Sequence, residues 1–268
     1  MIDVGAIEQE MLAQPQADCP VTHRFGPGIY IREVFLPRGA YVIGHLHTTA
    51  HVNIMLTGVL GLMNDNGTET ILRAPQTFVA PPGRKVAYIY EDVIWQNVHA
   101  TDVTDVEKLE EMFLDKSAVF LDHISRSTRP VSNTSEDVED YYDAIAEFGF
   151  DPLTVRLISE DETDQVPFPP GDYKVMVGAS VIEGRGLFAT GDIAANELIA
   201  VGRIDGKRTP AGRYTNHSKT PNAEMVRADD GDIYLFSLRP IRGCRGGQLG
   251  EEITVDYRQA LAVTLGGS

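Results

Sequence analysis

The stretch from Gly39 to Gly58, which reads GAYVIGHLHTTAHVNIMLTG, decides the fold of the N-terminal part of this 268-residue chain. It contains three of the seven histidines, His45, His47 and His51, all at odd-numbered positions. Alternate residues of a strand point to the same face, so on one continuous strand these side chains would lie together. Apolar and β-branched runs with turn residues between them surround the stretch. They indicate about eight short strands up to residue 102, which is typical of a sandwich or barrel.

The spacing of these residues resembles a known family. The pattern G-x5-H-x-H-x3-H-x6-G over residues 39–58 is similar to the first motif of the cupin family, with His51 where that family usually has Glu. Pro81-Pro-Gly83 resembles the P-x-G of its second motif, but Val86 stands where a fourth metal-binding His is expected. The resemblance covers roughly residues 25–102 and implies a cupin-like β-barrel.

The histidines allow two interpretations. His45, His47 and His51 would suit one divalent transition metal such as zinc, iron, nickel or copper, because three neutral imidazoles leave coordination positions open. His99 is a candidate fourth ligand. Alternatively, the cluster is the relic of a lost site, or polar residues simply line a small barrel. A cupin metalloenzyme is therefore one functional hypothesis, although the family's usual fourth ligand is missing.

Three segments near the C-terminus form a second set of motifs. They are Glu183-GRGLF-Ala189, Arg213-YTNHSKTP-Asn222 and Gly250-EEITVD-Tyr257. In order and spacing they resemble the opening, central and closing motifs of the SET-domain family of S-adenosylmethionine-dependent protein lysine methyltransferases, over roughly residues 173–260. The resemblance implies a minimal SET domain of the β-clip type, mainly β, with a pseudoknot-like threading.

The resemblance also implies roles for individual residues. S-adenosylmethionine would be bound by residues of all three segments: Gly184, Arg185, Gly186, Leu187, Asn216, His217 and Tyr257. The two glycines would let the backbone approach the methionine end of the cofactor. Backbone groups around His217 would bind the adenine. Tyr257 would be catalytic, since its phenol can orient the substrate lysine in a dry channel that lowers the pKa of the amine.

The C-terminal part also departs from larger members of that family. The segment before Arg213 is short, and no cysteine-rich tail follows Tyr257, so the acidic middle segment, another subunit or the substrate must close the lysine channel. A basic group, Arg203, Lys207, Arg208 and Arg213, either binds that acidic segment or forms a solvated surface. The compact form looks like short SET sequences encoded by tailed bacteriophages. A second hypothesis is therefore a non-catalytic virion or assembly protein that uses the cupin and SET folds as scaffold.

The charge distribution favours two domains and a connector. Residues 172–268 carry 12 acidic and 12 basic side chains, so the whole net charge of −16 comes from residues 1–171. We expect a cupin-like domain at residues 1–102, an acidic connector with a helix at residues 103–171 and a SET domain at residues 172–268. The cupin resemblance also implies a homo-oligomer through the cupin-like domain, because cupin barrels commonly associate through their sheets. Nucleic acid is not an expected partner, because its phosphates need a basic face.

The composition bears on location as well. The two cysteines, Cys19 and Cys244, are too few for a disulfide framework and suit a reducing cytosol. The first residues lack the order of a signal peptide, and the apolar stretches are too short to span a bilayer. We therefore expect a cytoplasmic protein that acts on a lysine of a protein substrate, with no membrane partner. A phage-encoded chain would lie in the host cytoplasm or the virion.

Overall fold

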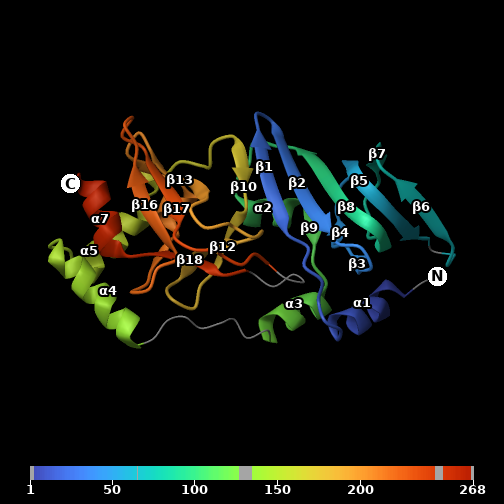
Figure 1. The fold of residues 1–268 in the computed structure, drawn as a ribbon, viewed down its shortest axis with the longest axis horizontal. Coiled ribbons are helices and arrows are strands. Elements are labelled where there is room, and N and C mark those ends of the chain that lie inside the picture. Colours follow the sequence, from blue (N-terminus) through green and yellow to red (C-terminus); the bar gives the residue numbers. More distant parts are fainter. Residues whose placement is uncertain (1–2, 65, 127–134, 245–249, 267–268) are drawn as a thin grey trace. The chain divides into compact units, whose positions relative to one another are not determined.

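The structure, a computed structural model, describes residues 3–64, 66–126, 135–244 and 250–266. It is mainly β, and the chain divides into two compact units. The first contains residues 1–128, 170–172 and 244–249, and the second contains residues 129–169, 173–243 and 250–268. Figure 1 labels most of their helices and strands. The segment that the sequence assigns to a connector, residues 103–171, contributes helices to both units.

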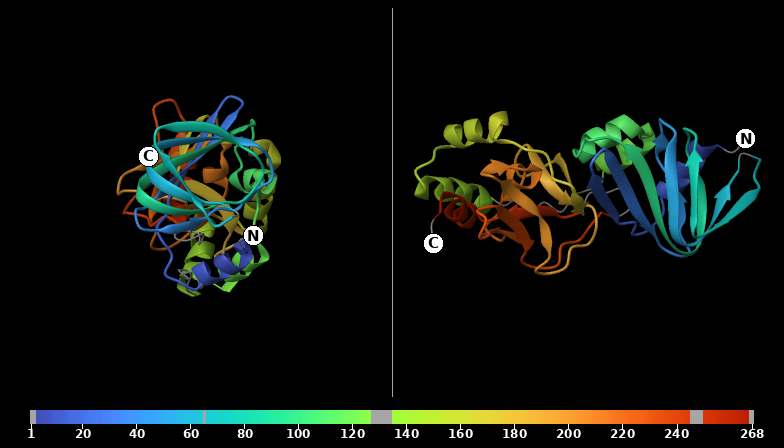
Figure 2. Two further views of the ribbon diagram at one scale, coloured as in Figure 1. Left: turned by 90° about the vertical axis from the view of Figure 1, so that its right-hand side faces the viewer. Right: turned by 90° about the horizontal axis from the view of Figure 1, so that it is seen from above.

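One curved sheet forms most of the first unit. Its strands are ordered β10-β1-β2-β8-β5-β6, with β3 paired to β8 and β7 paired to β5. The strands are β1 (Val21–Gly26), β2 (Ile29–Leu36), β3 (Tyr41–Ile43), β5 (His51–Met63), β6 (Glu69–Arg73), β7 (Gln76–Ala80), β8 (Val86–Ala100) and β10 (Gly171–Tyr173). Figure 2 shows the strands curving around a common interior. The strand pairs among the described residues leave the sheet open, so the β character is confirmed but the predicted closed barrel is not found.

The curvature comes from the two long strands, which change partners along their length. β8 pairs with β3 at residues 86–88 and with β2 at residues 93–100. β5 changes from β7 to β6 around Gly58, whose φ is 85°. A Cβ at this position would lie 2.3 Å from the carbonyl oxygen of Asp92. Only glycine fits such a close approach, so the histidine-containing stretch of residues 39–58 ends where β5 bends.

The interior of the first unit is apolar at one end. Met55, Leu60, Ile89 and Val93 of β5 and β8 form the buried core there. The histidines of the same two strands lie toward their other ends. The unit is completed by α1 (Val4–Leu12), α2 (Val106–Phe113), α3 (Ala118–Arg126) and the short pair β4 (Leu46–His47) and β9 (Leu114–Asp115).

Two small sheets form the centre of the second unit. One has the order β11-β12-β18-β15 and the other β14-β13-β17-β16. Their strands are β11 (Val175–Ala179), β12 (Arg185–Ala189), β13 (Leu198–Ile204), β14 (Lys207–Arg208), β15 (Asn216–His217), β16 (Ala223–Arg227), β17 (Ile233–Ser237) and β18 (Glu252–Val255). The helices are α4 (Ser135–Glu147), α5 (Pro152–Glu160), the 3-10 helix η1 (Glu162–Asp164), α6 (Pro210–Arg213) and α7 (Tyr257–Leu265).

The first of these sheets joins the three C-terminal motifs. β12 carries the first motif, β15 the second and β18 the third. β18 pairs antiparallel with β12, where Leu187 faces Ile253, and parallel with β15, where Asn216 faces Thr254. Segments far apart in the sequence therefore become neighbouring strands.

The acidic helix α4 covers part of this arrangement. It lies beside α7 in the views of Figures 1 and 2. Ile145 is buried, whereas Val138 and Tyr142, which the helical spacing places on the same apolar face, are 44% and 50% exposed. Asp137 of the acidic face is instead buried. Among the described residues, no helix is long and apolar enough to cross a membrane.

Candidate functional site

Asn216 connects the three motif segments. It lies on β15 and is buried. Its amide nitrogen is 3.2 Å from the carbonyl oxygen of Arg185, 3.3 Å from that of Glu183 and 2.7 Å from Oε1 of Glu252. The amide has two hydrogens to share among these acceptors. The side chain of Asn216 therefore ties the first motif to the third.

The ring of His217 makes a hydrogen bond at each nitrogen. The backbone N–H of Tyr257 donates to Nδ1 at 3.1 Å, which places the ring proton on Nε2. Nε2 lies 3.1 Å from the carboxylate of Asp140 and donates to it. Because the ring is also buried, it fixes the start of α7 and with it the backbone of Tyr257.

Tyr257, the predicted catalytic residue, is packed among aromatic rings. Its hydroxyl donates to the carbonyl oxygen of Thr215 at 3.3 Å. Its ring meets those of Tyr141 and His217 edge-on, with 5.8 Å and 5.2 Å between centroids. Burial raises the pKa of Tyr257 above its ordinary value, and Tyr141 adds to the rise. The phenol is therefore protonated at neutral pH and can donate or accept a hydrogen bond.

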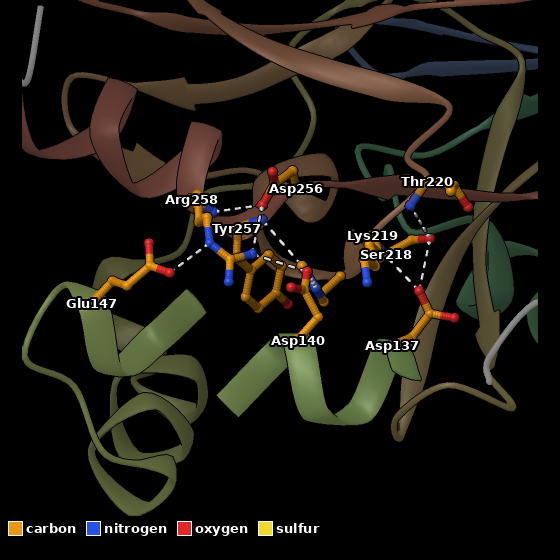
Figure 3. Close-up of polar contacts among 10 residues, drawn as sticks. Asp137, Asp140, Glu147, Ser218, Lys219, Thr220, Asp256, Tyr257 and Arg258 are labelled. Carbon is orange, nitrogen blue, oxygen red and sulfur yellow. Dashed lines mark hydrogen bonds and ion pairs between the residues drawn. The ribbon is translucent and has the colours of Figure 1, made fainter. Parts of the chain in front are cut away.

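Sequence reasoning missed the carboxylates of α4 that contact the second motif. Figure 3 shows Asp137 directed at the segment just after His217. Its Oδ1 accepts a hydrogen bond from the backbone N–H of Lys219 at 3.0 Å and one from the hydroxyl of Ser218 at 3.5 Å. A buried acid inside an otherwise acidic helix has no signature in the local pattern, because its partners are about 80 positions away.

A second contact of α4 reaches the end of the third motif. The guanidinium of Arg258 donates to Asp140 and to Glu147, both at 2.9 Å (Figure 3). The hydrogen bond from Arg258 is the main cause that lowers the pKa of Asp140, and the bond from His217 adds to it. Asp140 is therefore ionised at neutral pH and bridges the second motif to the third.

The predicted cofactor residues of the first motif differ in their surroundings. Gly184 has a φ of 46°, and nothing lies within 4 Å of a Cβ built on it. A Cβ on Gly186 would lie 2.1 Å from Oε1 of Glu252, so this glycine makes room for a side chain of the protein itself. Leu187 is fully buried in the core of the sheet. Only Gly184 offers open space beside its backbone.

Two arginines lie over one tyrosine next to these segments. The guanidinium carbons of Arg185 and Arg213 are 5.1 Å and 5.0 Å from the centroid of the Tyr214 ring. Nε of Arg213 is buried and has no hydrogen-bond partner among the described residues. Such an unpaired donor is costly unless something accepts from it.

The basic group around this site contacts the acidic middle segment, as one of its two interpretations predicted. Arg208 is buried and forms an ion pair with Asp164 at 2.7 Å, and Arg203 lies 3.6 Å from the same carboxylate. Arg213 donates to the hydroxyl of Ser159 at 2.8 Å. These contacts fix α5 and η1 to the strands β13 and β14.

The histidines that lie together in the first unit are His47, His51 and His99, and not the predicted group of His45, His47 and His51. The ring centroids of His47 and His51 are 4.0 Å apart, and that of His99 is 5.3 Å from His51. His45 instead packs edge-on against Phe120 of α3, at 4.6 Å. Two of the three predicted ligands therefore lie beside the candidate fourth.

These rings do not form a ready metal site as they are placed in the structure. The planes of His47 and His51 are 22° apart, so the rings stack face to face. Among the described residues, no group of three His, Cys, Asp or Glu side chains could hold a metal ion. Burial lowers the pKa of His47 to about 3 and that of His99 to about 4, so both rings are neutral. The metal centre stays a prediction that this arrangement does not favour.

Comparison with known proteins gives likeness only at the level of solved structures. No family model and no curated protein matches the chain. A cupin domain from Bordetella pertussis Tohama I has 17% sequence identity and a TM-score of 0.28, and the match covers 33% of this chain and 99% of that one. An RmlC-like cupin family protein with a double-stranded β-helix fold from Methanocaldococcus jannaschii has 17% identity and a TM-score of 0.27, over 35% of this chain and 88% of that one.

A third match is an HTH_3 family transcriptional regulator from Vibrio cholerae, with 16% identity and a TM-score of 0.26, over 36% of this chain and 61% of that one. The first two belong by their descriptions to the family that residues 25–102 resemble in sequence. At these scores the likeness carries no inference about activity.

Proposed function

We propose that the second unit is a SET-like domain that transfers a methyl group from S-adenosylmethionine to a lysine of a protein substrate. One observation carries the proposal. Three segments that resemble the SET motifs lie on adjacent strands, and the side chains of Asn216 and His217 link them to one another. A chance match of short motifs would not be expected to assemble in this way.

Two features of the second unit fit the cofactor. The space beside Gly184 allows a ligand to approach the backbone closely. Arg185 and the unpaired Nε of Arg213 supply positive charge and a donor for the carboxylate of the cofactor's methionine part. In this proposal Asn216 supports cofactor binding indirectly: its amide donates to backbone carbonyls of the first motif and holds that segment in place. When bound, the cofactor would supply a sulfonium methyl group: the amine would bond to its carbon in line as the carbon–sulfur bond breaks and a thioether leaves.

Tyr257 orients the amine in this proposal. Its hydroxyl hydrogen is directed to Thr215, which leaves the phenol oxygen as an acceptor for an amine N–H. A protonated phenol is no base, so the lysine must arrive neutral. The aromatic surroundings favour this, because exclusion of water lowers the pKa of an amine. Much of the rate enhancement would then come from position and desolvation.

The test uses the intact protein in two steps. Calorimetry with S-adenosylmethionine, and with its demethylated product, measures cofactor binding. Incubation with methyl-labelled cofactor and a lysate or lysine-rich peptide pool, followed by mass spectrometry, then measures transfer. Binding with transfer to lysine supports the proposal. No binding by the folded protein overturns it and favours the scaffold hypothesis.

A further inference from the structure

The interior face of the first unit carries a row of polar side chains beside its apolar core. On adjacent strands, Arg32 of β2 faces His23 of β1 on one side and Asn97 of β8 on the other. Asn97 in turn faces Asn53 of β5. His23, Asn53 and Asn97 are all buried, which is unusual for polar residues on one face of a sheet.

Most members of this row are paired with one another. Nδ1 of His23 and the hydroxyl of Tyr30 are 2.8 Å apart, and the amide of Asn97 donates to Asn53 at 2.7 Å. The nearby carboxylate of Glu110 is 2.6 Å from the amine of Lys116. Their hydrogen bonds and charges are therefore satisfied within the unit.

Arg32 is the exception. Its Nε is buried and has no hydrogen-bond partner, and none of the described carboxylates forms an ion pair with it. Its charge acts throughout the histidine cluster: it is among the causes that lower the pKa of His23, His45, His47 and His99. The charge of Glu110 acts on Arg32, but that carboxylate is already bonded to Lys116. Arg32 therefore has no described carboxylate of its own, and its buried Nε is a costly unsatisfied donor.

Two histidines on which the charge of Arg32 acts have unused nitrogens as well. Nδ1 of His45 and Nδ1 of His47 are buried and have no hydrogen-bond partner among the described residues. A neutral imidazole can carry its proton on either nitrogen, so both can act as donors. Arg32 and the two rings thus provide three unmatched donors in one interior.

We propose that this interior binds a small oxyanion, a carboxylate or a phosphate, through Arg32 with His45 and His47. The guanidinium fork suits two oxygens of such an anion, and neutral rings can donate to a third. The positive charge of Arg32 disfavours a metal cation in the same place, and no group of three possible ligands for one is found among the described residues. The proposal does not depend on the function of the second unit.

Isothermal titration calorimetry of the intact protein tests the proposal, with sodium phosphate and sodium malonate as probes and sodium chloride at equal ionic strength as the blank. Arg32→Gln should weaken binding of the preferred probe about tenfold to a hundredfold. Arg73→Gln, which removes an exposed arginine of β6, is the matched control and should leave affinity unchanged. The preferred probe tells a carboxylate site from a phosphate site.

A second measurement does not depend on the variant. NMR of the histidine ring nitrogens in the wild-type protein should show shifts of two rings as the anion is added, whether or not Arg32→Gln folds. Three results would overturn the proposal: no binding of either anion, equal binding by Arg32→Gln, or stoichiometric binding of zinc chloride by the same histidines.

Discussion

The ring of His217 donates a hydrogen bond to the carboxylate of Asp140, a residue 77 positions earlier in the chain, at 3.1 Å. On its other side the same ring accepts from the backbone of Tyr257. The carboxylate of Asp140 is therefore linked through the His217 ring to Tyr257, the residue to which we assign the reaction. Any displacement of α4 would loosen the start of α7.

Asp140→Asn tests this connection. The change keeps the shape of the side chain and removes its charge, so both His217 and Arg258 lose an ionised acceptor. We expect the free energy of unfolding to fall by about 1–2 kcal/mol, because hydrogen bonds to charged groups stabilise a protein more than bonds between neutral groups. The Asp140 side chain is also only 17% exposed to water. Urea unfolding measures the change. Glu139→Gln, on the exposed side of the same helix, is the control, and an equal effect of both variants would contradict the connection.

Tyr257→Phe separates catalysis from packing. It removes one hydroxyl, whose hydrogen bond to Thr215 is long at 3.3 Å, so the melting temperature should change little. Methyl transfer in a single turnover should fall by about tenfold or more, because the lost contact acts mainly in the transition state. Tyr142→Phe, a change at a residue that is 50% exposed, should alter neither quantity. Equal transfer by Tyr257→Phe and wild type would rule out the role given to this hydroxyl.

The two glycines of the first motif should respond differently to alanine. At Gly186 a methyl group would displace Glu252 from its hydrogen bonds with Ser180 and Asn216, so we expect a loss of about 2–4 kcal/mol in the free energy of unfolding. At Gly184 an alanine would have to adopt a left-handed backbone conformation, which should lower the free energy of unfolding by about 1 kcal/mol. Any further effect should be a loss of cofactor affinity. Denaturant unfolding and calorimetry distinguish the two. A larger stability loss at Gly184 would refute this assignment.

The first unit should lose stability in mild acid. Burial lowers the pKa of His23 to about 3, against about 6.5 in an unfolded chain, so the unfolded state binds the proton first. The stability that neutral His23 contributes is fully present above pH 6.5 and is lost as pH falls toward 3, by up to about 1.4 kcal/mol per pH unit. Urea unfolding between pH 7 and pH 5 measures the slope. Because His47 and His99 have lowered pKa values as well, His23→Asn should reduce the slope by the share of one histidine and leave the rest. An unchanged slope would show that His23 does not contribute to the loss.

Much of the strand pattern could be read from the sequence, because turns have local signatures. The Asn-Gly pair ending at Gly67 marks the turn between β5 and β6, where Gly67 has a φ of 79°. Gly58 also punctuates the pattern, but sequence alone gives no sign that β5 bends there against Asp92. The barrel followed from the strand count together with the cupin resemblance of residues 39–58, and neither determines which strand edges pair.

The sites were predictable only in part. Motif resemblance indicated Asn216, His217 and Tyr257, which the structure brings together. It gave no indication of Asp140, because helical periodicity reports the residues that are apolar and says nothing about a partner in another segment. Arg32 had a usable signal that was overlooked: it stands two residues after Tyr30, on the buried face of a strand, where a charge needs an explanation.

The position of β18 has a consequence for synthesis on the ribosome. This strand is the last one among the described residues, yet it lies between β12 and β15 in its sheet. Those two earlier strands have no shared neighbour until residues 252–255 have been translated. During synthesis, the sheet of the second unit therefore stays incomplete between β12 and β15 until β18 has been made. A premature stop codon anywhere before that strand would leave the three motifs unassembled.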